Sequence, residues 1–384
     1  MKIVHTCLCG AMTDGLTYQE NLLTKYHRRM GHDVTIIASQ YEWGAEGKKV
    51  LTEKTNYCNS DDVKMVRLPL RRGTVDSRLK TYPGLYRAVE AEHPDILFVH
   101  SCQFLDLITL ARYAKRHSGV RLYVDNHVDE SNGVHGWVSR NLLHKGLWRF
   151  CVHRIAPYVT RFYGTLPTRV ELLQKLYGLP ASRCALLLLG ADDEMVQRAA
   201  PPQVRRRIRE KYGIKEEDFL LVSGGKIDGY KTQTLLLMEA VQKLPNEKLR
   251  LIVFGSISED LKEKAFSFID GKKIQYIGWL QAKDTYDHFA AAELVVFPGG
   301  HSVFWEQAAA QGIPLLVNDW PGTHHIDLGG NVRFLRENSL EELQQAIGRL
   351  LDCPQEYRQM KAAAVEKGMQ EFSYARIARK AIEP

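Results

Sequence analysis

The feature that most constrains this sequence is a regular alternation of short apolar segments with longer amphipathic ones. Apolar residues recur at helical spacing in the longer segments, as in Leu22, Leu23, Tyr26 and Met30. The short segments are rich in β-branched residues and indicate strands at Lys2–Thr6, Asp33–Ser39, Lys64–Leu68, Asp95–Ser101, Val120–Val124, Arg161–Gly164 and Cys184–Leu189. Strands that alternate with helices form parallel sheets covered on both faces, so we expect an α/β fold.

A second series of the same kind follows a proline-punctuated stretch, AAPPQVRRR, in which Pro201 and Pro202 favour the start of a helix. Its strands are expected at Phe219–Ser223, Leu249–Gly255, Ile274–Gly278, Leu294–Pro298, Ile313–Asn318 and Val332–Leu335. We therefore expect two Rossmann-like, doubly wound domains at residues 1–199 and 200–370, facing a cleft between the carboxyl ends of their strands. The amphipathic segment 371–384 is expected to be a helix that packs back on the first domain.

The composition is that of a soluble globular protein, with 45% hydrophobic and 25% charged residues. The N-terminus does not fit a secretory signal peptide, and no window approaches the roughly 18 apolar residues of a membrane span, so a cytoplasmic protein is expected. The seven cysteines are scattered and fit reduced thiols. No cysteine or histidine spacing, nor ADDEM at 191–195, fits a metal site, so no metal is assigned.

A net charge of +7 favours anionic partners, such as phosphorylated small molecules, an acidic membrane face or nucleic acid. The basic clusters at 67–73 and 204–215 are not interleaved with aromatic residues as in a nucleic-acid groove, so no nucleic acid is expected. The second cluster is interpreted as the solvent face of a helix.

The stretch GGKIDGYKTQ, Gly224 to Gln233, resembles a phosphate-binding loop without being a Walker A loop, because Tyr230 separates Gly229 from Lys231. We expect a strand to end at Gly224-Gly225 and a helix to begin near Lys231. Glycines permit close backbone approach, and a helix N-terminus carries partial positive charge. With Lys226 and Lys231 beside it, the turn would bind a diphosphate. A turn with two solvated lysines is the alternative.

A second constellation lies in VFPGGHSVFWEQAAAQGIP. Gly299, Gly300 and His301 are expected to form a turn after a strand, and Ser302 to cap the next helix. Backbone N–H groups there would point at an anion. Glu306 lies too far into that helix to be explained by capping, and a carboxylate suits a pair of vicinal hydroxyls such as those of a ribose.

Together these motifs resemble those of the GT-B-fold glycosyltransferases, specifically the large retaining family 4. Gly225-Lys226 stands where that family has Gly-Arg, and Lys231 stands at its lysine position. Glu306, Gly312 and Pro314 match the second half of its E-x7-E…G-x-P motif. The segment 13–39 resembles its first loop, with Asp14 and Gly15, followed by its helix and the Gly-His-x-Val entry to the second strand.

The resemblance implies an enzyme that transfers a hexosyl group from a nucleotide-diphosphate sugar, most commonly a UDP-sugar, without a further cofactor. It assigns donor binding to Gly15, Gly225, Gly299, Gly300, His301, Ser302 and Glu306. Two departures affect it. Lys226 lacks the bidentate fork of arginine, and Pro298 stands where the first glutamate belongs, leaving His301 or the amides of Gly299 and Gly300 to replace it.

The resemblance also implies that His127, just beyond a strand in LYVDNHVDESNG, contacts the donor sugar near the reacting carbon. Catalysis is therefore assigned to Lys226, Lys231 and His127, with His100 and Asp14 as further contacts to sugar or acceptor. In this family the acceptor hydroxyl attacks from the face that the diphosphate leaves. The lysines would stabilise the departing diphosphate.

The acceptor is expected to be a saccharide or a polyprenyl-linked sugar in polysaccharide or glycoconjugate biosynthesis. The segment 136–164 mixes large apolar residues with arginine and lysine, so it is either a peripheral contact with an anionic inner-membrane face or a core-facing helix with a basic outer side. Other functions left open are a GT-B sugar-nucleotide epimerase, a two-domain ligand-binding protein and a nucleoside triphosphatase.

Overall fold

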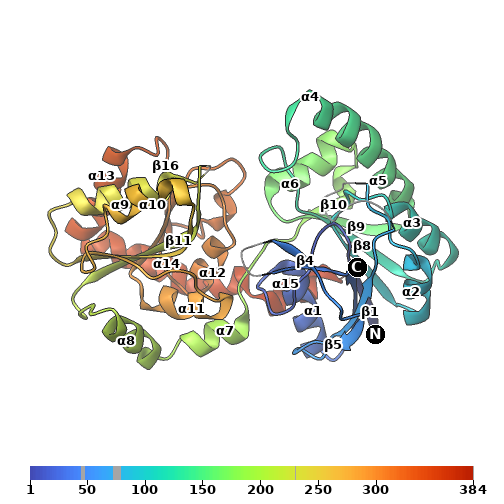
Figure 1. The fold of residues 1–384 in the computed structure, drawn as a ribbon, viewed down its shortest axis with the longest axis horizontal. Helices are drawn as coiled ribbons and strands as arrows, with labels where there is room; N and C mark the ends of the chain where they lie inside the picture. Colours follow the sequence, from blue (N-terminus) through green and yellow to red (C-terminus); the bar gives the residue numbers. More distant parts are fainter. Residues whose placement is uncertain (45–47, 72–78, 230, 384) are drawn as a thin grey trace. The chain divides into compact units, whose positions relative to one another are not determined.

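The computed structural model describes residues 1–44, 48–71, 79–229 and 231–383. Tyr230, Arg72 and Gly73 of the motifs above, and Pro384 of the C-terminal segment, lie outside the described residues. The chain divides into two compact units (Figure 1). Unit 1 comprises Met1–Leu189 and the residues from Tyr374 onward, and unit 2 comprises Gly190–Ser373. The division falls ten residues before the expected one at 199 and 200.

Unit 1 is built on a sheet in which the described strands lie in the order β10-β9-β8-β7-β1-β2-β6-β5. Neighbouring strands are parallel except for the β5–β6 pair. The strands are β1 (Lys2–Cys7), β2 (Asp33–Ser39), β5 (Asn56–Cys58), β6 (Lys64–Leu68), β7 (Ile96–His100), β8 (Arg121–Asn126), β9 (Val159–Gly164) and β10 (Cys184–Leu186). Between β2 and β5 in the sequence, β3 (Tyr41–Trp43) and β4 (Lys49–Leu51) form a separate antiparallel pair.

Helices cover both faces of this sheet because side chains alternate along each strand. On one face, Val4, Leu97 and Val99 pack with residues of α2 (Leu85–Glu92), α3 (Leu107–Arg116) and α5 (Arg149–Ile155). The same cluster includes residues of the π-helical segments η1 (Ser139–Trp148) and η3 (Leu172–Leu176), which adjoin α4 (Gly136–Val138) and α6 (Pro167–Glu171). Short 3₁₀ turns lie at η2 (Ala156–Tyr158) and η4 (Ala181–Arg183).

On the other face, Ile3, Ile96 and Phe98 pack against α1 (Gln19–Arg29) and against α15 (Tyr374–Ala381), the last helix of the chain. Tyr374, Ile377, Ala378 and Ala381 belong to this core cluster. In Figure 1, α15 lies beside α1 although the two helices are at opposite ends of the sequence. The C-terminal segment is therefore part of the core of unit 1.

Unit 2 holds a fully parallel sheet in the order β13-β12-β11-β14-β15-β16. The strands are β11 (Phe219–Ile227), β12 (Leu249–Ile257), β13 (Ile274–Tyr276), β14 (Leu294–Phe297), β15 (Leu315–Asn318) and β16 (Val332–Leu335). One face packs on α9 (Gln233–Lys243), α10 (Glu259–Phe266) and α13 (Leu340–Asp352). On the other, Phe254, Phe289 and Phe304 bring together β12, α11 (Ala282–Ala291) and α12 (Phe304–Ala310).

The remaining helices of unit 2 are α7 (Asp193–Ala199), α8 (Pro202–Lys211), the short η5 (His324–Ile326) and α14 (Pro354–Phe372). The interpretation of the basic cluster on α8 as a solvent face is wrong for two of its members. Arg205 and Arg209 both bind Glu293, at 2.5 and 3.0 Å, and Arg209 is only 2% exposed. Arg205 and Arg209, which were expected at the surface, thus attach α8 to the rest of unit 2 through Glu293.

Each expected strand is present, and the α/β prediction with two parallel sheets is confirmed. Two local expectations were wrong. β11 continues through Gly224 and Gly225 to Ile227, and α12 begins at Phe304 with Val303, not Ser302, at its N-cap. Within the described part of the chain, no helix is both long and apolar enough to cross a membrane.

Candidate functional site

The glycines at the end of β11 are required by the close approach of β12. A Cβ on Gly224 would lie 2.6 Å from the ring and carbonyl oxygen of Phe254, which is inside van der Waals contact. Gly225 has φ +113°, a conformation that other residues rarely adopt. Because Gly224 and Gly225 have no side chains, the backbone of β11 just before Lys226 is not covered.

This bare backbone opens into a small cavity of about 40 Å³ in unit 2. Six of the predicted site residues line it together: Gly225, Lys226, Lys231, Gly299, Gly300 and Ser302. Gly224, Gln233, Thr234, Phe297 and Pro298 complete the lining. The turn after β11 and the turn after β14 thus meet at the carboxyl edge of the sheet, where parallel sheets bind ligands.

The two lysines differ in their surroundings. The Lys226 ammonium lies 3.0 Å from Asp228 Oδ2, and its side chain is 67% exposed. Lys231 is exposed, and its backbone N–H donates to the carbonyl of Asp228 at 2.8 Å. The helix α9 begins two residues after Lys231, at Gln233, so both lysines lie in the segment that leads into its N-terminus. A cation pair beside the positive end of an eleven-residue helix attracts an anion.

The turn after β14 is held from the other side by Asn338, which follows β16. Its Nδ2 donates to the carbonyl oxygen of Pro298 at 2.6 Å. Gly299 lies against α9, since a Cβ there would be 3.4 Å from Gln233 Oε1. The hydroxyl of Ser302 accepts a long hydrogen bond from the N–H of Phe304 at 3.4 Å. Ser302 lines the cavity, and Val303 holds the N-cap position of α12.

Glu306 lies behind this turn and is fully buried. Its Oε1 accepts hydrogen bonds from His301 Nε2 at 2.7 Å and from His325 Nε2 at 2.8 Å. Burial acts to raise the pKa of Glu306, but the charge and hydrogen bonds of the two histidines outweigh it and lower the pKa to about 2. The carboxylate is therefore ionised, and its Oε2 has no hydrogen-bond partner among the described residues.

Sequence reasoning missed His325, which lies 19 residues beyond Glu306. No linear spacing marks it, because it follows β15 while Glu306 follows β14, and only the pairing of these neighbouring strands brings the two together. His301 or the amides of Gly299 and Gly300 were expected to replace the missing glutamate at 298. The Nε2 of His301 is hydrogen-bonded to Glu306, and Gly299 and Gly300 line the cavity.

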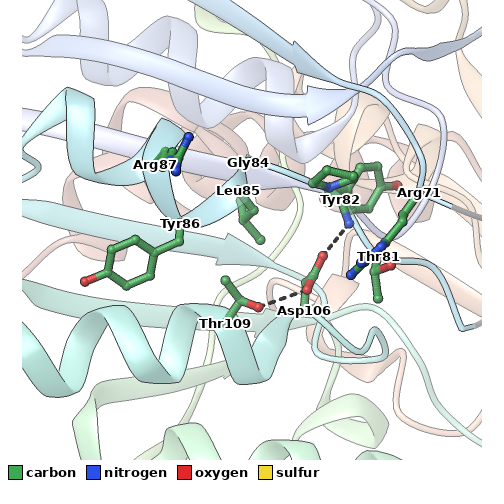
Figure 2. A pocket seen from close by; sticks show the side chains of 10 residues that line it. Arg71, Thr81, Tyr82, Gly84, Leu85, Tyr86, Arg87, Asp106 and Thr109 are labelled. Carbon is green, nitrogen blue, oxygen red and sulfur yellow. Dashed lines mark hydrogen bonds between the residues drawn. The ribbon is translucent and has the colours of Figure 1, made fainter.

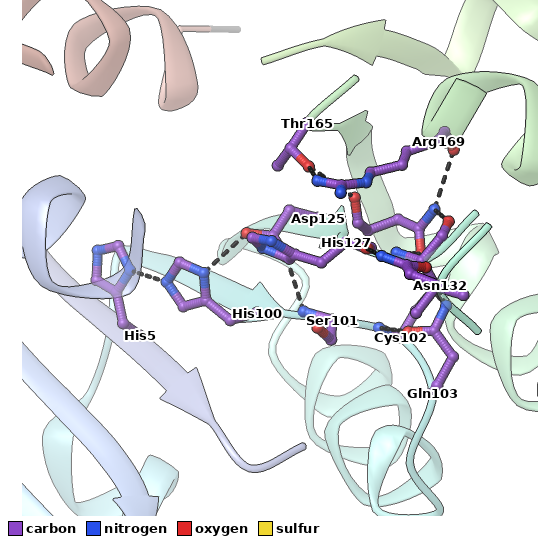
Figure 3. Close-up of polar contacts among 12 residues, drawn as sticks. His5, His100, Ser101, Cys102, Gln103, Asp125, His127, Asn132, Thr165 and Arg169 are labelled. Atoms are coloured by element: carbon purple, nitrogen blue, oxygen red, sulfur yellow. Dashed lines mark hydrogen bonds and ion pairs between the residues drawn. The ribbon is translucent and has the colours of Figure 1, made fainter. Parts of the chain in front are cut away.

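In unit 1, a buried carboxylate joins the two histidines that the sequence singled out. Asp125, at the end of β8, accepts from His100 Nδ1 at 2.8 Å and from the backbone N–H of Ser101 at 2.7 Å (Figure 3). His127 Nε2 lies 3.1 Å from Asp125 Oδ1, and its side chain is 28% exposed. Burial opposes ionisation of Asp125, yet the two imidazoles lower its pKa far below the usual range.

His100 is 5% exposed, and its second nitrogen is also occupied. Its Nε2 lies 3.0 Å from His5 Nδ1, and His5 Nε2 lies 3.0 Å from His27 Nδ1. Neither ring nitrogen of His100 is open to a substrate, whereas His127 is partly exposed. His5 and His27 were not predicted from the sequence, because a single histidine on a strand or helix usually fills a core position.

The first loop of unit 1 holds the other two predicted residues. Gly15 is exposed, has φ +74°, and has open space where a Cβ would be. Asp14 accepts a hydrogen bond from the hydroxyl of Tyr57 at 2.7 Å and lies 3.9 Å from buried Arg67. Asp14 is thus tied to β5 and β6, next to a glycine whose conformation leaves the backbone accessible.

A larger cavity of about 380 Å³ in unit 1 was not expected from the sequence (Figure 2). It lies between the N-terminal ends of α2 and α3. Asp106 is buried in its wall, accepting from Thr109 Oγ1 at 2.9 Å and from the N–H of Tyr82 at 2.5 Å. Its lining includes Arg71, Tyr86 and Arg87.

Two families of proteins account for most of the chain. The family model of the glycosyl transferase 4-like domain matches residues 16–190, and that of glycosyl transferases group 1 matches residues 204–367. The chain belongs to the glycosyl transferases of group 1. It is a nucleotide-sugar glycosyltransferase, as the motifs indicated, and the Walker-type alternative is set aside.

Similar proteins fit this assignment. The glycosyltransferase is 25% identical over 284 residues to EpsD of Bacillus subtilis, itself named as a glycosyltransferase, with 70% of each chain covered. Among solved structures, HepE of Anabaena in complex with UDP has a TM-score of 0.72 at 14% identity, covering 99% of this chain and 98% of that one. WaaG, a glycosyltransferase involved in lipopolysaccharide biosynthesis, has a TM-score of 0.68 at 15% identity with the same coverage. The GT-B fold prediction is confirmed.

Two groups in this glycosyltransferase bring three ligand-type atoms within 4.8 Å of one another: His100, Asp125 and His127 in unit 1, and His301, Glu306 and His325 in unit 2. In unit 2 both imidazoles are hydrogen-bonded to the carboxylate, and in unit 1 His100 is hydrogen-bonded to Asp125 while His127 Nε2 lies 3.1 Å from it. We assign no metal to either group.

Proposed function

We propose that this glycosyltransferase moves a sugar from a UDP-sugar to a saccharide or polyprenyl-linked acceptor with retention of configuration, in surface polysaccharide or glycoconjugate synthesis. The observation that carries the proposal is the cavity of unit 2, where Lys226, Lys231 and the glycine turns after β11 and β14 line one space. UDP is favoured as the nucleotide because structures of HepE, which share the fold, contain it.

The diphosphate is proposed to lie against Lys226, Lys231 and the N-terminus of α9. As the bond to the sugar breaks, negative charge grows on the departing oxygen, and fixed cations stabilise that charge more than they stabilise the bound donor. The departing diphosphate then accepts the proton of the attacking hydroxyl on the same face of the sugar. Loss of either ammonium group should lower the rate by about 10²- to 10³-fold.

Glu306 is proposed to accept a ribose hydroxyl through Oε2. This oxygen is buried and has no hydrogen-bond partner among the described residues, whereas Oε1 is taken by two histidines. A free carboxylate oxygen has two lone pairs and can accept from both vicinal hydroxyls of a ribose. The two histidines thus orient a carboxylate that the substrate completes.

His127 is proposed to contact the transferred sugar. Burial lowers the pKa of His127, but the charge of Asp125 outweighs it, so the pKa lies above the ordinary value. A neutral imidazole tolerates the positive charge that develops on the sugar, whereas an imidazolium repels it. We therefore expect transfer to decline as His127 becomes protonated at low pH.

The acceptor is proposed to bind unit 1, at the cavity between α2 and α3. That cavity lies at the carboxyl edge of the sheet, since helices of a parallel sheet begin where its strands end. Arg71 and Arg87 in its lining favour an acceptor that bears negative charge, such as the diphosphate of a polyprenyl-linked sugar.

A lipid-linked acceptor also requires contact with a membrane face. Trp137, Val138, Leu142 and Phe150 of α4, η1 and α5 are 52–70% exposed, next to exposed Lys145 and Arg149. Apolar side chains surrounded by cations fit an anionic bilayer surface. Changing Arg140, Lys145 and Arg149 to glutamate should abolish sedimentation with anionic vesicles while donor hydrolysis persists. Unchanged sedimentation would exclude this surface.

The nucleotide assignment is tested by thermal-shift measurements with UDP-, GDP-, ADP- and CMP-sugars beside ATP and GTP. A ligand that binds only the folded state raises the melting temperature, and at equal concentration the tighter ligand raises it more. We expect the largest shift with a UDP-sugar. A shift with a triphosphate alone would contradict the proposal.

A further inference from the structure

A line of buried hydrogen bonds crosses unit 1 from its last helix to the end of β8. We call His27, His5 and His100 the histidine chain. At one end His27 Nε2 donates to the carbonyl oxygen of Ala378 at 2.8 Å, and at the other His100 Nδ1 meets Asp125 Oδ2 at 2.8 Å. The two inner contacts are each 3.0 Å, and all three rings are at most 5% exposed.

Both ends of the histidine chain are acceptors. Ala378 lies in the last turn of α15, where a carbonyl lacks an intrahelical partner, and a carbonyl can only accept. Asp125 accepts through both oxygens, from His100 Nδ1 at 2.8 Å and from the backbone N–H of Ser101 at 2.7 Å, and its pKa lies far below the usual range, so it is a carboxylate. Protons must therefore be supplied to both ends by the imidazoles between them.

Counting the protons gives a definite result. Four contacts join Ala378, the three imidazoles and Asp125, and each needs one proton. A neutral imidazole carries one ring proton, so three neutral imidazoles supply three. A chain with three protons would leave two bare lone pairs facing each other among buried side chains, at the cost of a buried unsatisfied group.

We propose that the histidine chain holds four protons, and that the fourth makes His100 an imidazolium paired with Asp125.

The position of the fourth proton follows from the surroundings of each ring. Burial holds the pKa of His5 well below its ordinary value and lowers that of His27 to about 4. Of the three rings, His100 alone contacts a carboxylate among the described residues. An ion pair with Asp125 offsets the cost of burying a charge, so the extra proton belongs on His100.

This proton has a consequence for His127, which rests on the function proposed above. His100 and His127 share Asp125, so an imidazolium at His100 neutralises the carboxylate that would otherwise favour protonation of His127. The other charged groups acting on His127 are Glu20, which favours its cation, and Arg169, which opposes it. On the far side of the chain, His32 faces His27. His100 is thus a positioning residue that helps keep His127 neutral.

Two variants of His27 separate the proposal from a merely structural role. In His27→Leu the chain is shortened to two contacts, which two neutral imidazoles can satisfy, so the extra proton is lost. In His27→Gln the amide can donate to Ala378 and its oxygen can accept from His5, so His100 must still carry both protons. The two variants therefore differ in the number of protons that the remaining hydrogen bonds require.

The readout is nitrogen-15 NMR of the full chain labelled at histidine, at about pH 8, where an ordinary histidine is neutral. The signal of His100 is assigned by its absence in His100→Asn. We expect two protonated ring nitrogens in the wild type and in His27→Gln, and one in His27→Leu. A bare nitrogen on His100 of the wild type, or an imidazolium that survives in His27→Leu, would overturn the proposal.

The wild-type spectrum decides the matter even if His27→Leu does not fold, and it needs no sugar transfer. If the protein transferred no sugar, the proposed function would be refuted. The protonation of His100 would still be decided by the NMR spectrum. In an active protein, the acid limb of kcat/KM should move up by about one pH unit in His27→Leu and stay in place in His27→Gln. Equal limbs in both variants would refute the link to His127.

Discussion

At the scale of single residues, the chemistry of this glycosyltransferase depends on carboxylates whose charge is set by buried histidines. Glu306 of unit 2 and Asp125 of unit 1 are both fully buried, and each is paired with two imidazoles. One imidazole of each pair lies at or just after the end of a neighbouring strand: His325 after β15, and His100 at the end of β7. The carboxylates are therefore charged in the folded protein and oriented before any substrate binds.

Glu306→Gln should reveal this charge in the stability of the protein. The pKa of Glu306 is lowered to about 2, so its contribution is complete above the ordinary value of 4.5 and is lost as the pH falls from there toward 2. At about 1.4 kcal/mol per pH unit, the wild type should be roughly 3 kcal/mol more stable than the variant near pH 7. The difference should shrink below about pH 4.5, as measured by urea unfolding.

The exposed Glu366 offers a control for that experiment, because Glu366→Gln removes a charge without breaking a buried pair. It should change the free energy of unfolding by less than about 0.5 kcal/mol. A difference between wild type and Glu306→Gln that does not depend on pH would contradict the assigned charge.

At the scale of elements, α12 is positioned by its contact with α14. Gly368, near the C-terminal end of α14, lies so close to α12 that a Cβ there would be 2.1 Å from the carbonyl oxygen of Ala309. The close approach explains why a glycine, a poor helix former, occupies a helix interior. Since α12 also carries Glu306, this packing fixes the depth of the carboxylate behind the donor cavity.

Alanine at Gly368 and at Gly348 should have opposite effects. Gly368→Ala forces α12 and α14 apart and should cost about 1–3 kcal/mol of unfolding free energy. Gly348 lies inside α13 with open space around its Cβ position, so Gly348→Ala should stabilise the protein by up to about 1 kcal/mol. Thermal or urea unfolding measures both. Two stabilising substitutions would show that α14 does not contact α12 as described.

Helices and strands with a long periodic pattern were predicted well from the sequence. Very short strands and the exact ends of elements were predicted poorly. The strands of both sheets, except β5, were expected from runs of apolar residues. The three-residue strands β3, β4 and β5 are too short and too polar to show a period. The glycines of β11 indicated a turn, but pairing with β12 keeps the strand going to Ile227, a contact that local propensity cannot reveal. Likewise, His325 and the histidine chain arise only when neighbouring strands bring distant residues together.

At the scale of the whole molecule, the chain is two units of which the first includes the last helix. The core cluster around Ile3, Phe98 and Tyr123 contains Tyr374 and Ile377 of α15. The hydroxyl of Tyr123 also donates to the carbonyl oxygen of Ile382 at 3.1 Å. Folding of unit 1 is therefore completed only when the end of the chain is present.

Ending the chain at Ser373 should destabilise unit 1 specifically. Hydrogen exchange should lose protection in β1, β7 and β8, because α15 covers one face of these strands, while β11, β12 and β14 keep theirs. Lys380→Ala, which changes an exposed side chain of α15, should leave both patterns unchanged. Equal loss of protection in the two units would contradict their division.

The proposed contact between the donor diphosphate and the two lysines of unit 2 can be measured by titration calorimetry with UDP and uridine. Lys226→Met and Lys231→Met should each weaken UDP binding about tenfold or more, the value of a charge-assisted hydrogen bond, and leave uridine binding unchanged. Lys243→Met, at the far end of α9, should bind both ligands as the wild type does. Undiminished affinity for UDP in both lysine variants of the cavity would contradict the account.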